Sequence, residues 1–180
     1  MNAILRMAAR VAFYPTLGFS RAMERLGRWN RWDWVDDHVL LGAMPSRSDL
    51  SRLQAMGVGA VINLCREFRG HTDELAERGL EQLHLPTVDY HSPRPADVLV
   101  GIRFITAKVE AGGKVYVHCK AGRGRSATLV VCYLMSASGM SAQDAYSAVK
   151  SARPQVDRGL ADRPVVRAVQ DAIQSKASRR

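Results

Sequence analysis

A cysteine, an arginine and a serine stand close together in the second half of this chain of 180 residues. Cys119 is followed by five residues and then by Arg125 and Ser126. A thiolate is a strong nucleophile, a guanidinium grips two oxygens of a phosphoryl group as a planar fork, and a hydroxyl donates a hydrogen bond to sulfur. The three types together predict attack of sulfur on phosphorus. Because a chain with three cysteines and 21 arginines shows this spacing by chance about once in three, the surrounding residues must supply the specificity.

The residues on either side of this triplet predict a strand, a loop and a helix. Residues 115–117 form an apolar run typical of a central parallel strand, and residues 127–137 form the apolar stretch of a buried helix. Gly122 and Gly124 let the loop curl, so that its N–H groups and the helix dipole surround an anion. We therefore expect the pKa of Cys119 to lie below the usual value of about 8.5. The loop residues expected to bind substrate are Lys120, Ala121, Gly122, Arg123 and Gly124.

Residues 118–126, HCKAGRGRS, resemble the signature loop of the protein tyrosine phosphatase superfamily in its dual-specificity branch. Further stretches resemble the phosphatidylglycerophosphate phosphatases of mitochondria and their plant and bacterial relatives: residues 13–16, 37–43, 61–62, 81–89 and 117–128. The resemblance extends from about residue 11 to about residue 173. It implies a phosphocysteine mechanism that uses no metal and no cofactor, and a lipid phosphomonoester as substrate.

Hydrolysis of an alkyl phosphate also needs an acid, because the departing alkoxide is a poor leaving group. Asp89 lies about 30 residues before Cys119, after the apolar residues 83–85 and just ahead of a loop with two prolines, and the family's general acid falls at this matching position. Asp97 is the rival. It fits the first turn of a helix predicted at residues 96–111, where a carboxylate favours the helix dipole. We therefore favour Asp89 as the general acid.

Lys120 and Arg123 add two cations to Arg125 within the loop. Phosphotyrosine would not require them, whereas a substrate with a second phosphate, such as phosphatidylglycerophosphate, would be attracted by them. The alternative is that both side chains point to solvent. The chain also departs from the family pattern at residues 65–69, where CREFR replaces a sequence close to Asn-Glu-x-Tyr-Glu. If that loop reaches the pocket, we expect a more positive field there.

The first 32 residues carry six arginines against one acid, Glu24, in a chain of net charge +9. Nucleic acid is not the expected partner, because the basic residues are scattered and there is no stacking aromatic motif. Residues 4–12 place apolar side chains on one helical face until Pro15 interrupts the pattern, which predicts a helix lying on an anionic membrane surface. Trp29, Trp32 and Trp34 would then lie at the headgroups. The alternative is a helix folded back on the domain, with the tryptophans packed beneath it.

This organisation predicts a basic amphipathic segment at residues 1–32, a dual-specificity phosphatase domain at 33–176 and a basic tail at 177–180. No run approaches the roughly 20 apolar residues of a membrane span. A mitochondrial presequence is the competing interpretation of the N-terminus, but hydroxyl residues are few and the resemblance already begins near residue 13. Arginine outnumbers lysine 21 to five, as in chains from GC-rich genomes. We therefore expect a peripheral protein on the cytoplasmic face of a bacterial membrane, with the mitochondrial inner membrane as the alternative.

Alternating strand and helix signals predict a single α/β domain with a mostly parallel central sheet flanked by helices. Ser46 is expected to cap a helix that stops at Gly57, Ser141 to cap residues 142–151, and Pro164 to start a last amphipathic helix. The chain is long enough to bury one core.

An odd number of cysteines without a secretory signal predicts a reducing compartment. Cys132 is expected in the core. Cys65 ends a predicted strand beside that of Cys119, so it is either a partner for a reversible disulfide or an ordinary buried thiol. The five histidines show no metal-ligand spacing, and His118 is expected to orient the loop.

A lipid phosphatase is the leading functional hypothesis. A dual-specificity protein phosphatase and a phosphoinositide phosphatase would share every catalytic residue. A silent phosphate-binding module is less favoured, because this chain retains Cys119, Asp89 and Arg125. The sequence does not indicate an oligomeric state.

Overall fold

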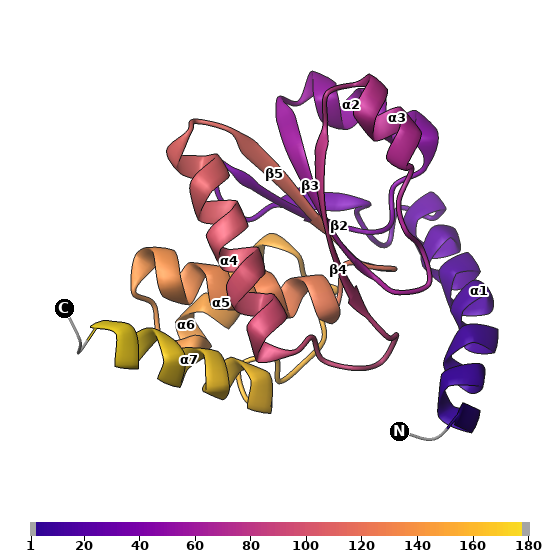
Figure 1. Ribbon diagram of the computed structural model, residues 1–180. Helices are drawn as coiled ribbons and strands as arrows, with labels where there is room; N and C mark the ends of the chain where they lie inside the picture. Colours follow the sequence, from indigo (N-terminus) through magenta and orange to yellow (C-terminus); the bar gives the residue numbers. More distant parts are fainter. Residues whose placement is uncertain (1–2, 178–180) are drawn as a thin grey trace.

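A five-stranded sheet forms the centre of the protein (Figure 1). The computed structural model describes the backbone of residues 3–177 and the side chains of residues 13 and 15–175. The strand order is β1-β2-β5-β3-β4, in which β1 pairs antiparallel with β2 and the other neighbours are parallel. The strands are β1 (Trp32–Trp34), β2 (Val39–Gly42), β3 (Val58–Cys65), β4 (Glu81–Thr87) and β5 (Lys114–His118). The predicted α/β fold with a mostly parallel sheet is confirmed.

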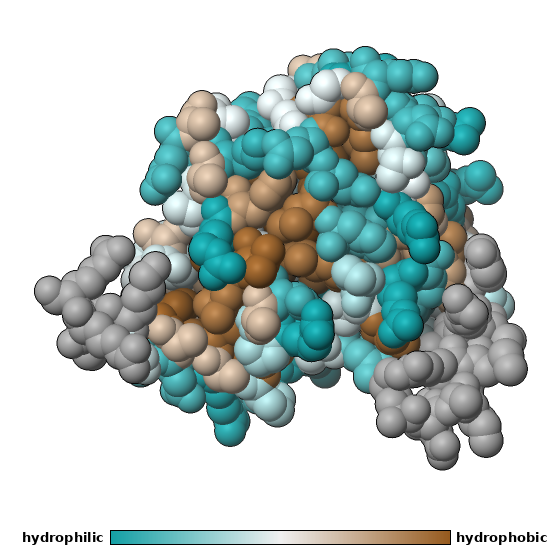
Figure 2. All heavy atoms as spheres, in the orientation of Figure 1, coloured by the Kyte–Doolittle hydropathy of each residue, from teal (hydrophilic) through white to brown (hydrophobic). Residues whose placement is uncertain are grey.

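Helices cover the sheet on both sides (Figure 1). One group consists of α4 (Pro95–Glu110), α5 (Arg125–Ser138), α6 (Ala142–Ala152) and α7 (Pro164–Ala177). On the other side lie α2 (Arg47–Ala55) and α3 (Thr72–Glu77). The α1 helix (Ala3–Arg25) stands apart from both groups and contacts Lys120 in the loop that follows β5. Figure 2 shows apolar side chains at the surface in the centre of one face, over α4 and the strands beside it, and mainly polar side chains over α2 and α3.

The central strands are buried on both faces, which explains their nearly continuous apolar sequence. Ile62 and Val117 point into the larger core, which they share with α4, α5, α6 and α7. Val61 and Tyr116 point the other way, into a smaller core with Leu50 of α2. Because successive side chains of a strand face opposite sides, β3 and β5 supply both cores.

The predicted helix signals lie at the ends of helices in the structure. Ser46 and Asp49 form a capping box at α2, in which the Ser46 N–H donates to an Asp49 oxygen at 2.7 Å. Ser141 accepts from the Asp144 N–H at the start of α6. Gly139 ends α5 with a φ of 64°, a conformation that glycine adopts without steric cost.

The prediction that Pro15 interrupts the first helix is wrong. The α1 helix runs for 23 residues and contains Pro15. Proline removes one backbone donor of the helix. The Thr16 hydroxyl donates to the carbonyl of Phe13 at 3.2 Å, an additional side-chain bond to the helix backbone rather than a replacement for that donor. The apolar face predicted at residues 4–12 lies outside the described side chains.

Trp29 packs against α1, as the folded-back alternative predicted, whereas Trp32 and Trp34 pack against the smaller core. Trp29 lies edge-on against Phe19 of α1, with ring centroids 5.7 Å apart. Trp32 packs edge-on against Tyr116 at 6.1 Å, and Trp34 is partly buried against the same smaller core. Over the described residues, no helix has both the length and the apolar character needed to cross a bilayer.

Candidate active site

The loop between β5 and α5 surrounds the sulfur of Cys119. Cys119 follows the last residue of β5 and is 3% exposed. The Ser126 hydroxyl donates to the sulfur at 3.2 Å, and the backbone N–H groups of Ser126 and Gly122 also point at it. Gly122 has a φ of 66°, and a Cβ there would collide with the carbonyl oxygen of Gly42. Only glycine fits this position without a shift of the backbone.

These contacts set the pKa of Cys119. Burial by itself raises the pKa of a thiol, but here the charge of Arg125 and the hydrogen bonds from Ser126 and Gly122 outweigh burial, so the pKa of Cys119 lies below its ordinary value. The direction agrees with the prediction from the sequence. The other two cysteines, Cys65 and Cys132, are equally buried without such donors, and burial raises the pKa of each.

Arg153 holds the loop from its outer side. When the N–H groups of a loop point inward, its carbonyls point outward and need donors of their own. Arg153 donates from Nε to the carbonyl of Gly122 at 2.9 Å and from Nη2 to that of Ala121 at 3.1 Å. Its Nη1 is anchored by Asp33 of β1 at 2.6 Å, and the residue is 1% exposed. The sequence reasoning missed Arg153, because nothing in the local sequence marks it as a partner of the loop.

Arg125 stands in the first turn of α5, and both terminal nitrogens of its guanidinium donate hydrogen bonds. Nη1 donates to Oε2 of Glu67 at 2.9 Å and to the carbonyl of Thr87 at 2.7 Å. Nη2 donates to Oδ1 of Asp89, also at 2.9 Å. Glu67 accepts the Asp89 N–H as well, at 2.8 Å, so it ties the arginine to the segment that follows β4.

Glu67 was missed, although its loop was singled out in the sequence. The expectation there was a more positive field from the two arginines of residues 65–69. Neither Arg66 nor Arg69 lines the cavity that contains Cys119, whereas the carboxylate of Glu67 reaches Arg125. Although residues 65–69 depart from the family pattern, they keep one buried carboxylate, that of Glu67, in contact with Arg125.

The structure brings Asp89 to the site and leaves Asp97 outside it. Asp89 lies two residues after β4 and is 6% exposed, with one oxygen on Arg125 and the other accepting from Lys120. Asp97 occupies the first turn of α4, as predicted, and pairs with Arg94 at 2.7 Å.

The two additional loop cations have different surroundings. Lys120 is buried and points inward, where its ammonium also donates to the Thr16 hydroxyl of α1 at 2.7 Å. Arg123 lies at the rim, with its guanidinium over the ring of Trp29 at 4.8 Å and within 3.3 Å of Asp157. The alternative that both point to solvent is therefore wrong for Lys120.

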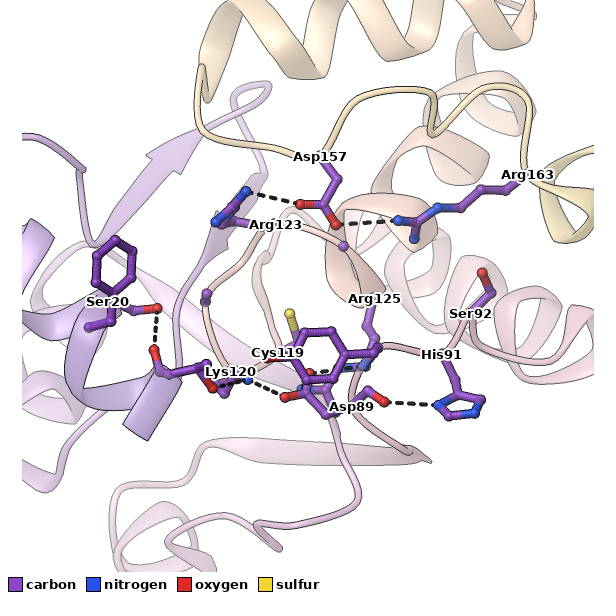
Figure 3. Close-up of a pocket in the computed structure, with 15 residues that line it drawn as sticks. Ser20, Asp89, His91, Ser92, Cys119, Lys120, Arg123, Arg125, Asp157 and Arg163 are labelled. Carbon is purple, nitrogen blue, oxygen red and sulfur yellow. Dashed lines mark hydrogen bonds and ion pairs between the residues drawn. The ribbon is translucent and has the colours of Figure 1, made fainter. Parts of the chain in front are cut away.

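A cavity of about 500 Å³ opens above the sulfur (Figure 3). Figure 3 shows Cys119 and Arg125 between two groups of side chains, Lys120 with Asp89 on one side and Arg123, Asp157 and Arg163 on the other. The remaining wall comes from α1 and from the loop after β4; the lining residues there are Thr16, Phe19, Ser20, Tyr90, His91 and Ser92. The contribution of α1 and of Arg163 was not predicted, because both are distant from the loop in the sequence.

The other titratable residues near the loop differ in their surroundings. His118, at the end of β5, is fully buried, and desolvation lowers the pKa of His118 to about 3, so its imidazole is neutral at pH 7. Its Nδ1 lies 3.3 Å from the carbonyl of Cys119.

Cys65 ends β3 and is a free thiol, like Cys119. Among the described residues, no group of three histidines, cysteines or acids is arranged to hold a metal ion.

A buried reactive thiol at the end of a parallel strand, facing an arginine across a nest of backbone donors, defines a cysteine-based phosphatase. Comparison with protein families supports this: residues 39–161 match the dual specificity phosphatase catalytic domain. The chain belongs to this family and is a phosphatase, which confirms the predicted family and enzyme class.

Individual relatives are similar over most of their length. The phosphatidylglycerophosphate phosphatase PTPMT2 of Arabidopsis thaliana is 38% identical over 171 residues, which cover 92% of this chain and 74% of the relative. The phosphatidylglycerophosphatase and protein-tyrosine phosphatase 1 of Rattus norvegicus is 39% identical over 158 residues, 82% of each chain. Two crystal structures of PTPMT1, one in complex with PI(5)P, superimpose with TM-scores of 0.76 and 0.75 at 32% and 30% identity. These cover 83% and 82% of this chain and 99% of each solved chain.

Proposed function

We propose that this phosphatase hydrolyses phosphatidylglycerophosphate to phosphatidylglycerol and inorganic phosphate through a phosphocysteine. The observation that carries the proposal is the lowered pKa of Cys119 at the floor of a cavity that Arg125, Asp89 and Lys120 also line. A lower pKa increases the fraction of thiolate, which is the form of cysteine that attacks phosphorus.

The first step forms a sulfur–phosphorus bond and breaks the phosphorus–oxygen bond to the lipid. The thiolate of Cys119 attacks, Arg125 holds two phosphoryl oxygens, and protonated Asp89 gives its proton to the departing alkoxide. In the structure Arg125 donates to both Asp89 and Glu67. An incoming phosphoryl group therefore has to replace Asp89 as the acceptor of the hydrogen bond from Nη2 of Arg125. The exchange leaves Asp89 beside the leaving group.

The second step returns the enzyme to its starting state. Water attacks the phosphocysteine, the Asp89 carboxylate accepts a proton from that water, and the sulfur leaves as a thiolate with the Ser126 hydroxyl as its hydrogen-bond donor. Inorganic phosphate is released. The loop residues from Lys120 to Gly124 bind the oxygens of the phosphoryl group through backbone N–H groups.

The choice of a lipid with two phosphates rests on the relatives and on charge. Both relatives are named for phosphatidylglycerophosphate, and a similar crystal structure holds PI(5)P. Lys120 and Arg123 pair with Asp89 and Asp157, and all four residues line the cavity of Cys119 together with Arg125 and Arg163. The cations of the lining therefore outnumber its carboxylates, which leaves positive charge for a second phosphate. The rat relative also carries protein-tyrosine phosphatase in its name, so phosphopeptides are the competing substrate class.

A phosphate-release panel tests the substrate. Phosphatidylglycerophosphate, phosphoinositides and phosphopeptides are presented side by side, the lipids in mixed micelles, and kcat/KM is compared. We expect phosphatidylglycerophosphate to be turned over fastest. Faster turnover of phosphopeptides would replace the lipid assignment with a protein phosphatase, and no turnover of any of them by a folded protein would leave a silent phosphate-binding module.

Replacing the proposed acid should separate good from poor leaving groups. Asp89→Asn should slow a lipid substrate by roughly 10² or more and an activated aryl phosphate much less, because an aryl oxide needs little protonation. Asp97→Asn is the matched control and should change neither rate, since Asp97 pairs with Arg94 outside the cavity. Equal losses of Asp89→Asn on both substrates would point to another acid.

We also propose that the protein works at an anionic membrane surface, with residues 1–32 as the basic anchor. The cytoplasmic face of a bacterial membrane is the proposed location, and the mitochondrial inner membrane is the alternative. Fractionation of the native host should find the protein with membranes at low salt and release it at high salt, because screening weakens the attraction of arginine for anionic lipid.

A further inference from the structure

In the part of the chain whose side chains the structure describes, the large exposed aromatic side chains are gathered at the mouth of the active-site cavity. Five large hydrophobic residues are exposed in the described part of the chain: Phe19, Leu26, Tyr90, Val100 and Met140. Two of them are aromatic, Phe19 at 57% and Tyr90 at 69% exposure, and both line the cavity above Cys119. They come from separate segments, α1 and the loop that follows β4.

The backbone of Tyr90 is held in a conformation that tyrosine rarely adopts. Its φ is 61°, the one positive φ of a non-glycine residue in the described chain. Such a conformation costs about 1 kcal/mol or more and persists where the surroundings impose it, most often at functional sites. The Tyr90 N–H donates to Asp89 at 3.1 Å, and the Tyr90 ring lies 4.8 Å from the Lys120 ammonium. This backbone conformation places an exposed ring beside the two charged groups of the site, Asp89 and Lys120.

Phe19 has cationic neighbours as well. Its ring packs edge-on against Trp29, and the guanidinium of Arg123 lies over the ring of the same Trp29. Arg123 and Arg163 share one carboxylate, Asp157, with contacts of 3.3 Å to each of its oxygens. These three charges sum to one net positive charge at the rim, and all three line the cavity (Figure 3).

Aromatic rings combined with arginines are the side chains that proteins use at the headgroup layer of a bilayer. The ring has an apolar body that enters the interface, and the guanidinium attracts anionic lipid. A phosphomonoester on a membrane lipid is attached to the bilayer, so a cavity that is to receive it has to open towards that surface. Residues of α1 form part of the wall of this cavity. The α1 helix lies within residues 1–32 of the chain, which carry six arginines.

We propose that the cavity mouth, defined by Phe19, Tyr90, Arg123 and Arg163, is a docking surface for anionic phospholipid membranes. Phe19 and Tyr90 enter the interfacial layer, and Arg123 and Arg163 lie against the anionic headgroups. A lipid phosphomonoester then reaches Cys119 without leaving the bilayer. The proposal rests on the proposed function for its purpose, but the surface is defined by exposure and charge alone.

Vesicle binding of the full-length protein tests this surface. The double variant Phe19→Ser/Tyr90→Ser is compared with the wild type on phosphatidylcholine vesicles with and without phosphatidylglycerol, a lipid that carries no phosphomonoester. We expect at least about tenfold weaker binding to the anionic vesicles, because two rings no longer leave water for the interface. Met140→Ser is the matched control: Met140 follows the far end of α5, about 20 Å from the loop, and should bind like the wild type.

A second measurement does not depend on losing a side chain. Phe19→Trp and Met140→Trp are each exposed to vesicles whose acyl chains carry bromine, which quenches tryptophan at short range. Fluorescence should fall more for Phe19→Trp than for Met140→Trp, when each is corrected for the wild-type signal. Equal quenching, or a double variant that binds like the wild type, overturns the proposal.

The outcomes separate this surface from the substrate assignment. Binding is measured on a lipid that cannot be hydrolysed, so it can depend on Phe19 and Tyr90 even if the substrate panel excludes phosphatidylglycerophosphate. Conversely, turnover of that lipid with binding independent of both rings would leave the function standing and remove the docking surface. A concentration-dependent dimer that the double variant abolishes, with vesicle binding intact, would assign the surface to a second copy of the chain instead.

Discussion

Cys119 is as buried as the other two cysteines of the chain, yet its pKa moves in the opposite direction. The difference comes from the positive charge and the hydrogen-bond donors around the sulfur of Cys119. Arg125, Ser126 and Gly122 stabilise the thiolate of Cys119, whereas burial alone acts on Cys132 and raises the pKa of Cys132 to about 12. A cavity above Cys119 also gives reagents access to the sulfur.

This contrast predicts selective alkylation. At pH 7, iodoacetamide should modify Cys119 much faster than Cys65 or Cys132, and its rate should level off at a pH below the usual thiol value of about 8.5. Mass spectrometry of tryptic peptides over a pH series measures both. Cys119→Ser should remove the fast phase and abolish phosphatase activity. A rate that keeps rising through pH 9 would show an ordinary thiol.

Arg153 provides a test of how the loop is held. Arg153→Met keeps much of the side-chain volume but removes the donors to the carbonyls of Ala121 and Gly122. The loop N–H groups should then point less well at the sulfur, so the alkylation midpoint of Cys119 should move up in pH and kcat should fall roughly tenfold or more. Arg47→Met is the control, because Arg47 of α2 is a largely exposed arginine that pairs with Glu74 of α3.

A merely structural role for Arg153 would give a different result. Arg153→Met would then lower the melting temperature while the pH profile of alkylation stayed that of the wild type. That outcome would remove Arg153 from the residues that position the loop.

The parts of the site that are local in sequence were predictable, and the parts that cross the fold were not. Cys119, Arg125 and Ser126 lie within eight residues, so strand, loop and helix place them by themselves. The contact between Arg125 and Glu67 spans 58 residues, and that between Lys120 and Thr16 spans 104. Such pairs depend on how the sheet and α1 come together, which a single sequence does not encode in a visible pattern.

At the scale of elements, β5 carries a buried histidine next to the reactive loop. His118 stacks on Tyr116 at 5.6 Å and is 1% exposed. Desolvation lowers the pKa of His118 to about 3, against about 6.5 for an exposed imidazole. Between these two pH values the unfolded chain binds a proton at His118 that the folded chain does not bind. The part of the unfolding free energy that depends on His118 is therefore fully present above about pH 6.5 and is lost progressively as the pH falls below that value.

Replacing this histidine should therefore make stability less dependent on pH. Between pH 7.5 and pH 5.5 the wild type should lose about 1.4 kcal/mol of unfolding free energy through His118. His118→Asn should lack this loss, so the stability gap between the two proteins narrows by that amount at the lower pH. Urea titrations at both pH values measure the gap, and a constant gap would mean that His118 is protonated in the folded state.

Element prediction succeeded where the pattern has a single explanation. The apolar runs of β3 and β5 are too short for buried helices and lie between glycine-containing turns, so they indicate central strands. The prediction at Pro15 was wrong because a proline within a helical pattern has two possible outcomes: it ends the helix, or the helix tolerates it and continues. In this chain the second outcome holds, because α1 continues through Pro15.

At the scale of the molecule, α1 belongs to the catalytic domain as much as to any anchor. Phe13 is buried, the Lys120 ammonium lies 5.3 Å from its ring, and Thr16 and Ser20 line the cavity. Glu24 near its end forms an ion pair with Arg31 at 2.7 Å. Because one segment both lines the site and carries the basic N-terminus, the proposed membrane attachment would be linked to the geometry around Lys120.

Two truncations separate these contributions. Removing residues 1–11 deletes Arg6 and Arg10 but keeps Phe13 and Thr16, so binding to phosphatidylglycerol vesicles should weaken several-fold while turnover of a soluble aryl phosphate stays within about twofold. Removing residues 1–28 also deletes Phe13 and Thr16, the two partners of Lys120 on α1, so aryl phosphate turnover should fall as well. Sedimentation with vesicles and phosphate release measure the two effects, and raising the salt should mimic the shorter truncation in binding alone. If the shorter protein binds vesicles as the wild type does, the arginines before Phe13 do not meet the membrane, and attachment depends on the cavity mouth alone.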